Sequence, residues 1–89
     1  MGSQRRLLIA NRGEVALRII RTAQESGFHT VTIYPEDDEA SLHVRRADEA
    51  IRLSGVGPAA YLDIDEITNI AVATNCPVSY QHLKLPTNF

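Results

Sequence analysis

The sequence predicts an α/β fold, a small doubly wound parallel sheet covered by helices. Three observations lead to this prediction. Short apolar or β-branched runs alternate along the chain with longer segments of helical period. Residues 7–10, Leu-Leu-Ile-Ala, are apolar at every position, which is typical of a strand buried on both faces of a sheet. The 89 residues, 44% hydrophobic and 22% charged, are enough for one small domain and exclude a second one.

The first strand is expected at residues 7–10, with a helix directly after it. Asn11 and Glu14 have the spacing of a capping box, in which each side chain accepts a hydrogen bond from the other residue's backbone N–H. An apolar helix face then recurs at three- and four-residue spacing, formed by Val15, Ala16, Ile19, Ile20 and Ala23. Gly27 stands where a left-handed residue ends a helix. We therefore expect Asn11 to cap this helix and Gly27 to terminate it.

A second strand, an acidic loop, a short helix and a third strand are expected next. Residues 30–34 are β-branched or aromatic and precede a proline, as is typical of a strand. The acidic residues 36–39 form the loop, residues 41–46 the short helix and residues 49–53 the third strand. Because parallel neighbours need a crossover connection, usually a helix, this order of elements predicts parallel pairing.

The second long helix is expected to begin at Asp63, after a connector that contains two glycines. Asp63 and Glu66 repeat the capping-box spacing, and Asn75 suits the left-handed position at the helix end. Residues 5–76 are therefore assigned to one domain. Residues 77–89 are expected to form a divergent tail, whose first four residues, Pro-Val-Ser-Tyr, supply a fourth strand beside the first.

Charge and composition argue against several classes of partner. Lys and Arg total 9 against 11 Asp and Glu, a formal charge of -2, so no nucleic-acid partner is expected. No apolar run approaches the roughly 20 residues that cross a bilayer, so no membrane partner is expected. Cys76 is the single cysteine, which excludes an intramolecular disulfide and indicates an intracellular protein.

The loop after the first strand is the usual place for a ligand in an open parallel sheet, because strand ends and a helix N-terminus meet there. Gly13 is the one glycine available where a dinucleotide fingerprint needs three. Arg12 would attract an anion, whereas Glu14 in the first helical turn would repel it. A structural cap is therefore the favoured interpretation of residues 11–14, and a phosphate site is the alternative.

The remaining residues with chemical potential lack partners at the required spacing. Glu36 stands where the ribose-binding acid of a dinucleotide fold would stand, but the glycines that give this position meaning are missing. Residues 36–39 lack the alternating ligands and the glycine of a calcium loop, so a solvated turn is expected. Cys76 is expected to be a small buried apolar residue. The histidines stand singly, at His29, His43 and His82, and no metal or catalytic site is expected from them.

Arg18, Arg21 and Glu25 lie on the polar side of the first helix, at three- and four-residue steps that let side chains meet. The default interpretation is a solvated face. A protein contact is the alternative, because arginine is enriched at interfaces and pairs with carboxylates across them.

Residues 7–21, LLIANRGEVALRIIR, resemble the opening motif of biotin carboxylases, the ATP-dependent component of acetyl-CoA, propionyl-CoA, pyruvate and urea carboxylases. The resemblance continues through residues 27–34, 43–50 and 60–64. It implies a Rossmann-like sheet of the kind placed before an ATP-grasp fold. It also implies a parent ligase that forms carboxyphosphate from ATP and bicarbonate, with magnesium, and carboxylates N1 of biotin.

The departure from this family is as informative as the match. Members usually continue after the second helix with the motif HPGYGFLSEN, which is absent here, and their nucleotide-binding lysines, metal-binding carboxylates and catalytic arginine lie further along. The resemblance therefore implies a domain truncated at its C-terminal end, without catalytic, cofactor-binding or metal-binding residues. ATP, magnesium and biotin would be cofactors of the parent enzyme, which is placed in the cytoplasm or, after loss of a transit peptide, in mitochondria.

The resemblance also suggests partners. In family members that dimerise through the biotin carboxylase, the residues matching Arg21 and Glu25 lie at the subunit interface. This match implies a homodimer contact through the first helix, or docking on the rest of a carboxylase subunit. Two alternatives to an inactive fragment stay open: an interaction module that docks on a carboxylase, and a small nucleotide-binding domain.

Overall fold

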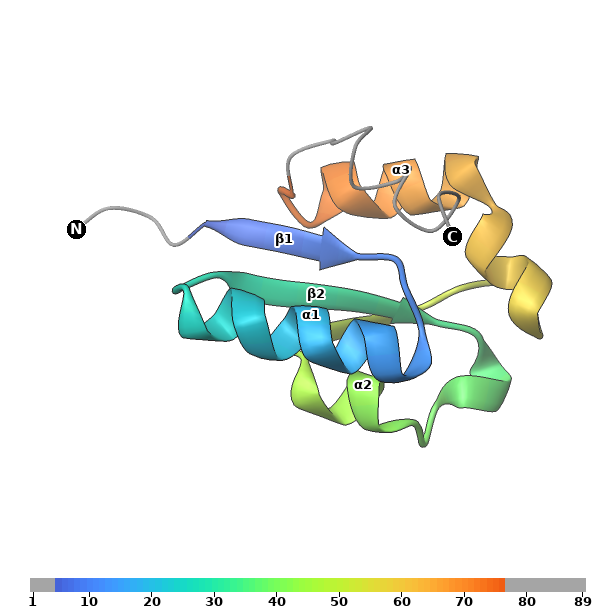
Figure 1. The fold of residues 1–89 in the computed structure, drawn as a ribbon. Coiled ribbons are helices and arrows are strands. Elements are labelled where there is room, and N and C mark those ends of the chain that lie inside the picture. Colours follow the sequence, from blue (N-terminus) through green and yellow to red (C-terminus); the bar gives the residue numbers. More distant parts are fainter. Residues whose placement is uncertain (1–4, 77–89) are drawn as a thin grey trace.

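The three strands of residues 5–76, the part of the chain that the computed structural model describes, form one parallel sheet in the order β1-β2-β3 (Figure 1). The strands are β1 (Arg6–Ile9), β2 (His29–Tyr34) and β3 (Glu49–Arg52). The expected α/β class and parallel pairing are confirmed, although β1 begins and ends one residue before the expected range.

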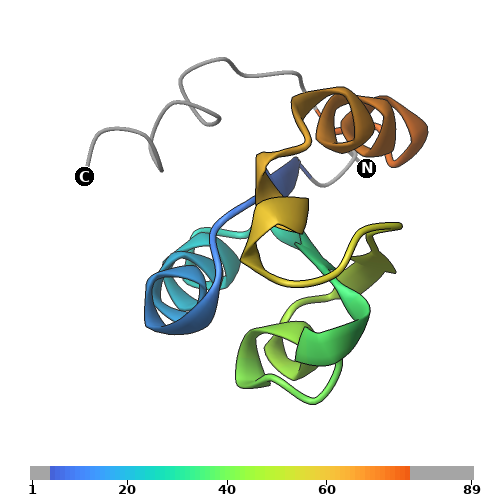
Figure 2. The ribbon, with the colours of Figure 1, turned by 90° about the vertical axis from the view of Figure 1, so that its right-hand side faces the viewer.

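Helices connect the strands and cover both faces of the sheet. The chain continues from β1 into α1 (Gly13–Glu25), from β2 into the short 3-10 helix η1 (Glu36–Asp38) and α2 (Leu42–Arg46), and from β3 into the 3-10 helix η2 (Pro58–Leu62) and α3 (Ile64–Ala73). Seen along the strands, α1 and α2 lie on one side of the sheet and α3 on the other (Figure 2). The two 3-10 helices were not expected from the sequence. The expected fourth strand at residues 77–80 lies outside the described residues.

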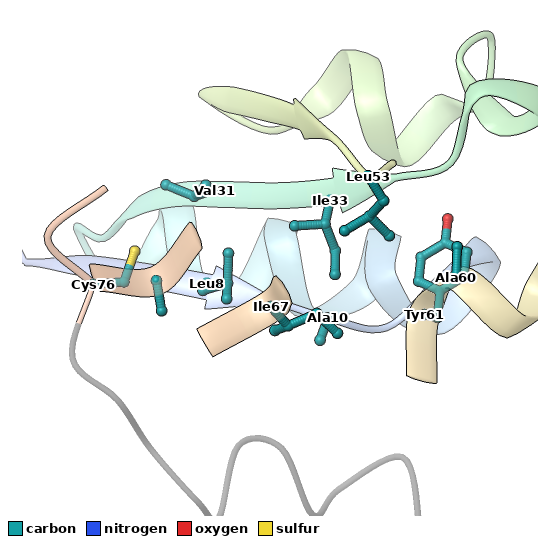
Figure 3. Packing of buried hydrophobic residues seen from close by; sticks show 10 residues of the cluster. Leu8, Ala10, Val31, Ile33, Leu53, Ala60, Tyr61, Ile67 and Cys76 are labelled. Atoms are coloured by element: carbon teal, nitrogen blue, oxygen red, sulfur yellow. The ribbon is translucent and has the colours of Figure 1, made fainter. Parts of the chain in front are cut away.

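Alternating side chains of β1 and β2 supply the two cores. Leu8 and Val31 point to the α3 side, where they pack with Ile67 and Ala71 (Figure 3). Their neighbour Ile9 belongs to the second core and packs against α1, whose Ala16 and Ile20 are buried with it. Burial on both sides explains why residues 7–10 are apolar at every position rather than at alternate ones.

Both long helices end as the sequence indicates. Gly27 has φ 89°, and the backbone N–H of Phe28 donates to the carbonyl of Ala23, as in a Schellman motif. Asn75 has φ 63°, and the N–H of Cys76 donates to the carbonyl of Ala71. The left-handed positions predicted for Gly27 and Asn75 are therefore confirmed.

The amino ends of the strands are tied together by polar side chains. Arg6, at the start of β1, forms an ion pair with Glu49 of β3 and donates through Nε to the carbonyl of Thr74, just beyond α3. Asp48 Oδ2 accepts from the backbone N of Thr30 at 2.8 Å and from its hydroxyl at 2.9 Å. These hydrogen bonds lower the pKa of Asp48, because they favour the ionised carboxylate. They also fix the turn between α2 and β3 against β2.

Candidate functional site

The loop between β1 and α1 lies at the carboxyl end of the sheet, beside η1 and η2 (Figure 2). The prediction that Asn11 caps α1 is wrong. The N-cap position falls on Arg12, which makes no side-chain cap hydrogen bond, and α1 begins at Gly13 with φ 63°. Asn11 is instead 7% exposed, and its Oδ1 has no hydrogen-bond partner among residues 5–76. Asn11 is buried like the preceding residues of β1, and its side chain does not cap the helix.

Arg12 joins this loop to the two 3-10 helices. Its Nη2 lies 3.5 Å from Asp38 Oδ2, and its guanidinium carbon lies 5.5 Å from the centroid of the Tyr61 ring. The Tyr61 hydroxyl donates to the same Asp38 oxygen at 2.9 Å. Since the Arg12 side chain is 51% exposed, we expect its ion pair with Asp38 to contribute at most about 1 kcal/mol. The guanidinium is therefore held in place by two weak contacts, with the Asp38 carboxylate and the Tyr61 ring.

The acidic residues 36–39 are only partly the solvated turn expected from the sequence. Glu36 and Glu39 are exposed, whereas Asp38 binds Tyr61. Asp37 Oδ1 accepts from the backbone N of Gly57 at 3.0 Å. Burial and the neighbouring Asp38 carboxylate raise the pKa of the Tyr61 hydroxyl, which keeps it protonated as a donor. The two central acids thus attach the connector and η2 to η1.

The histidines and the cysteine described by the structure do not come together. His29 Nε2 lies 3.0 Å from Glu49 Oε1 at the amino ends of the strands, while His43 is buried near Tyr61. Cys76 is buried in the core shared with α3, as expected (Figure 3). Between residues 5 and 76 no three His, Cys, Asp or Glu side chains are grouped so that they could hold a metal ion. His82 lies outside the described residues.

A cavity of about 550 Å³ opens at the carboxyl end of the sheet, between the start of α1 and η2. Its walls are mostly apolar, and Asn11 and Arg12 are its polar members. Leu62, on its rim, is 70% exposed. The cavity can therefore hold a mainly apolar group. Gly13 is the one glycine of residues 11–14, where a dinucleotide fingerprint needs three.

The predicted interface residues lie on the opposite, polar side of α1. Arg21 and Glu25 are exposed, and no hydrogen bond or ion pair within residues 5–76 occupies their side chains. A separate groove of about 640 Å³ follows α1 and is lined mainly by apolar side chains, among them Val15, Ile19 and Phe28; its charged member is Arg18, not Arg21 or Glu25. Exposed charges without a partner on a helix face are suited to contact with another protein.

Sequence reasoning missed the roles of Asp38 and Tyr61. In the sequence, Asp38 is one of four acidic neighbours and Tyr61 is part of the stretch 60–64. The signal that could have found them is the position of both residues after strands of one parallel sheet, because the carboxyl ends of such strands meet at one edge. None of the helices between residues 5 and 76 has the length and apolar character needed to cross a membrane.

Comparison with known proteins places this geometry among carboxylases. A family model described as biotin carboxylase, N-terminal domain, matches residues 3–80. A putative urea carboxylase of Emericella nidulans is 51% identical over 71 residues, which cover 80% of this chain and 6% of that protein. The chain thus spans a small part of the length of such relatives.

Solved structures agree with this match. The biotin carboxylase domain of a single-chain bacterial carboxylase superposes with a TM-score of 0.79 and 53% identity, over 81% of this chain and 17% of that one. The biotin carboxylase domain dimer of Hydrogenobacter thermophilus 2-oxoglutarate carboxylase, solved with MgADP and bicarbonate, gives a TM-score of 0.77 and 39% identity, over 85% and 17% of the two chains.

Proposed function

Since this chain belongs to the biotin carboxylase N-terminal domain family, we propose that it forms the amino-terminal part of a biotin-carboxylating unit and that these 89 residues have no turnover by themselves. The observation that carries the proposal is the match of residues 3–80 to the family model, together with the superposition on a biotin carboxylase domain. In the parent enzyme, ATP and bicarbonate would form carboxyphosphate, and the carboxyl group would pass to biotin.

The expected inactivity follows from how phosphoryl transfer is catalysed. The reaction depends on positioned metal ions, phosphate clamps and cationic groups that stabilise the transition state, together worth many kcal/mol. The present chain covers 17% of the superposed biotin carboxylase domain. We propose that ATP, magnesium and biotin are held by the part of the parent enzyme beyond this match.

The first experiment measures phosphate release by the purified 89-residue chain with ATP, bicarbonate, magnesium and free biotin. The expected result is a rate equal to the blank, whereas a full-length biotin carboxylase in the same assay releases phosphate in response to biotin. A circular dichroism spectrum with helical content shows that the inactive sample is folded. Biotin-dependent phosphate release by the 89-residue chain would overturn the proposal.

A second candidate function, docking on a carboxylase subunit, is favoured by one specific observation. Arg21 and Glu25 are exposed on one side of α1, and no hydrogen bond or ion pair within residues 5–76 occupies their side chains. Opposite charges four residues apart on one helix can pair across a two-fold axis, because each then faces its complement on the second helix. We therefore propose that this face of α1 contacts a carboxylase subunit or a second copy of the chain.

Charge reversal tests this contact. Recovery of the chain on an immobilised full-length biotin carboxylase is compared for the unchanged protein, Arg21→Glu and a matched control, Arg45→Glu, which reverses an exposed charge on α2. The proposal requires loss of recovery with Arg21→Glu alone. For a homodimer, the doubly swapped Arg21→Glu/Glu25→Arg chain should recover self-association in size-exclusion chromatography. Equal recovery of all variants, or of none, counts against docking.

The remaining alternative, a small nucleotide-binding domain, has a separate readout. Titration with ATP and with NAD would shift the NMR signal of Gly13 and its neighbours only if the β1–α1 loop holds a nucleotide. As for location, we propose that the protein works in the cytoplasm or in mitochondria, in line with the carboxylase assignment.

A further inference from the structure

His43 is a titratable group enclosed at the carboxyl end of the sheet and used by nothing in the proposed function. It belongs to α2, is 1% exposed, and lies with its Nε2 atom 3.4 Å from the hydroxyl oxygen of Tyr61. That hydroxyl lies in turn 2.9 Å from Asp38 Oδ2. The cluster thus connects α2, η1 and η2 through one hydroxyl group.

The hydrogens of this cluster can be assigned from its chemistry. An ionised carboxylate only accepts, so the single hydrogen of the Tyr61 hydroxyl goes to Asp38. The contact between Tyr61 and His43 is then a hydrogen bond only if Nε2 of the imidazole carries a hydrogen and donates it. The contact between Tyr61 and His43 therefore forms with a neutral His43, whose buried Nδ1 atom has no hydrogen-bond partner within residues 5–76. A proton taken up in acid would go to Nδ1; Nε2 would keep its hydrogen, and the cost would be a net charge on a side chain that is buried.

The charged groups around His43 oppose each other. The Asp38 carboxylate of η1 and the backbone of Ile33 in β2 favour the imidazolium, whereas the guanidinium of Arg12, from the β1–α1 loop, disfavours it. Burial is the largest effect and lowers the pKa of His43 below its ordinary value. The Asp37 carboxylate of η1 is among the groups that raise the pKa of the neighbouring Tyr61 hydroxyl.

We propose that Asp38, Tyr61 and His43 form a pH-sensitive latch, which holds η2 on the carboxyl end of the sheet while His43 is neutral and releases it when His43 is protonated. Release hydrates the imidazolium. Because Ala60 and Tyr61 of η2 belong to the core and η2 also lines the cavity beside Asn11, opening would expose both. The latch is a property of residues 5–76 and does not depend on the proposed carboxylase function.

The direction of the pH effect follows from linkage. In the open form His43 meets water and takes its ordinary pKa near 6.5, while in the closed form the pKa is lower. The open form therefore binds the proton more tightly, and the closed form loses stability as the pH falls below about 6.5. Well above that pH neither form binds the proton, so the closed form keeps its full stability.

The test measures amide hydrogen exchange of the 89-residue chain at pH 7.5 and pH 5.0, corrected for the intrinsic pH dependence of exchange. Two amides report on η2, because Ala60 N donates to the Gly57 carbonyl and Asp63 N to the Ala60 carbonyl. Their opening is expected to increase several-fold at the lower pH. Amides of β2, which lies in the middle of the sheet, should not change by this factor.

Variants separate the latch from a general acid effect. His43→Gln keeps an N–H near the position of Nε2 but cannot be protonated, so the increase in opening should disappear. His29→Gln, at the other end of the strands, should retain it. If His43→Gln does not fold, Tyr61→Phe replaces it: η2 should then exchange faster already at pH 7.5 and respond less to acid. An unchanged response in His43→Gln or in Tyr61→Phe, or no response in the unchanged chain, would overturn the proposal.

Discussion

The two long helices begin with the same sequence spacing and with different structures. Asn11 and Glu14 precede α1 as Asp63 and Glu66 precede α3. Asp63 does cap its helix: its carboxylate accepts from the backbone N of Glu66 at 3.1 Å. Asn11 does not, because it is buried and the N-cap position falls one residue later. The same spacing therefore gives a side-chain cap only at α3, where the first residue is exposed and turns toward the helix.

What precedes each helix explains the difference. Asn11 follows β1 and Ala10, and like Ala10 it is buried. The backbone takes a left-handed conformation only at Gly13. Asp63 follows the exposed Leu62 at the end of η2 and is itself exposed. Glu66 is also used differently from the reciprocal pattern, since its Oε2 accepts from the backbone N of Ser54 at 3.0 Å and from its hydroxyl at 2.8 Å. α3 is thereby tied to the end of β3.

The largest expected loss of stability comes from a change at Gly13, the residue at which α1 begins without a side-chain cap. Gly13→Ala puts a side chain at φ 63°, although nothing lies within 4 Å of the added carbon. The loss of unfolding free energy should be about 1–2 kcal/mol, because only the left-handed conformation is penalised. Urea denaturation measures it. Gly13→Asn is the control, because asparagine adopts the left-handed conformation more readily than alanine. It should lose less unfolding free energy; equal losses in the two variants would contradict a conformational cause.

Removal of the true cap should be the next largest effect. Asp63→Ala is expected to lower the free energy of unfolding by about 1 kcal/mol, since the N–H of Glu66 loses its acceptor. Asp63→Ser keeps an acceptor oxygen, so it should lower the free energy of unfolding by only a few tenths of a kcal/mol. If the alanine and serine variants unfold at the same urea concentration, the hydrogen bond to Glu66 does not stabilise α3.

Asn11→Ala is the matched change at the other helix and should cost less than Asp63→Ala, about 0.5 kcal/mol or below. No cap is lost, and removal of a buried oxygen without a partner offsets the lost packing. Comparison of the two alanine variants under the same conditions is the measurement. A loss for Asn11→Ala as large as that for Asp63→Ala would mean that Asn11 does stabilise the start of α1.

The smallest change in unfolding free energy is expected at the C-terminal ends of α1 and α3, because both helices end there in the same way. Gly27 and Asn75 both take left-handed conformations. Asn75→Gly should raise the free energy of unfolding by a few tenths of a kcal/mol, since glycine adopts this conformation without steric cost. The reverse exchange, Gly27→Asn, should lower it by a similar amount. A destabilised Asn75→Gly would show that the asparagine side chain contributes something beyond its conformation.

The elements of the fold could be predicted because each depends on local patterns. The apolar run of β1, the periodic face of α1 and the left-handed residues after both helices are visible in single segments. The 3-10 helices could not be predicted, since η1 is held by contacts between Asp37, Asp38 and residues some twenty positions away. Asn11 was misjudged for the same reason: its burial is decided by the packing of β1 within the sheet.

The candidate sites were predictable to different degrees. Arg21 and Glu25 were singled out by spacing and by resemblance, and the structure leaves both exposed, although their role as interface residues stays a prediction. The cluster of Arg12, Asp38 and Tyr61 was not foreseen, because its members come from separate loops and meet only when the strands align. A single sequence shows periodicity along one element but not which loops share an edge.

The contact of Arg6 with the carbonyl of Thr74 has a consequence for chain connectivity. A side chain at the beginning of the described segment reaches the backbone near its end, so the two ends of residues 5–76 lie close together. Segments with neighbouring ends can be circularly permuted when a short linker joins those ends and new ends are opened in an exposed turn. Residues 54–56 form an exposed connection of this kind, with a bend at Ser54 and Gly55. A permuted chain opened there would keep every strand pairing and begin instead with η2 and α3.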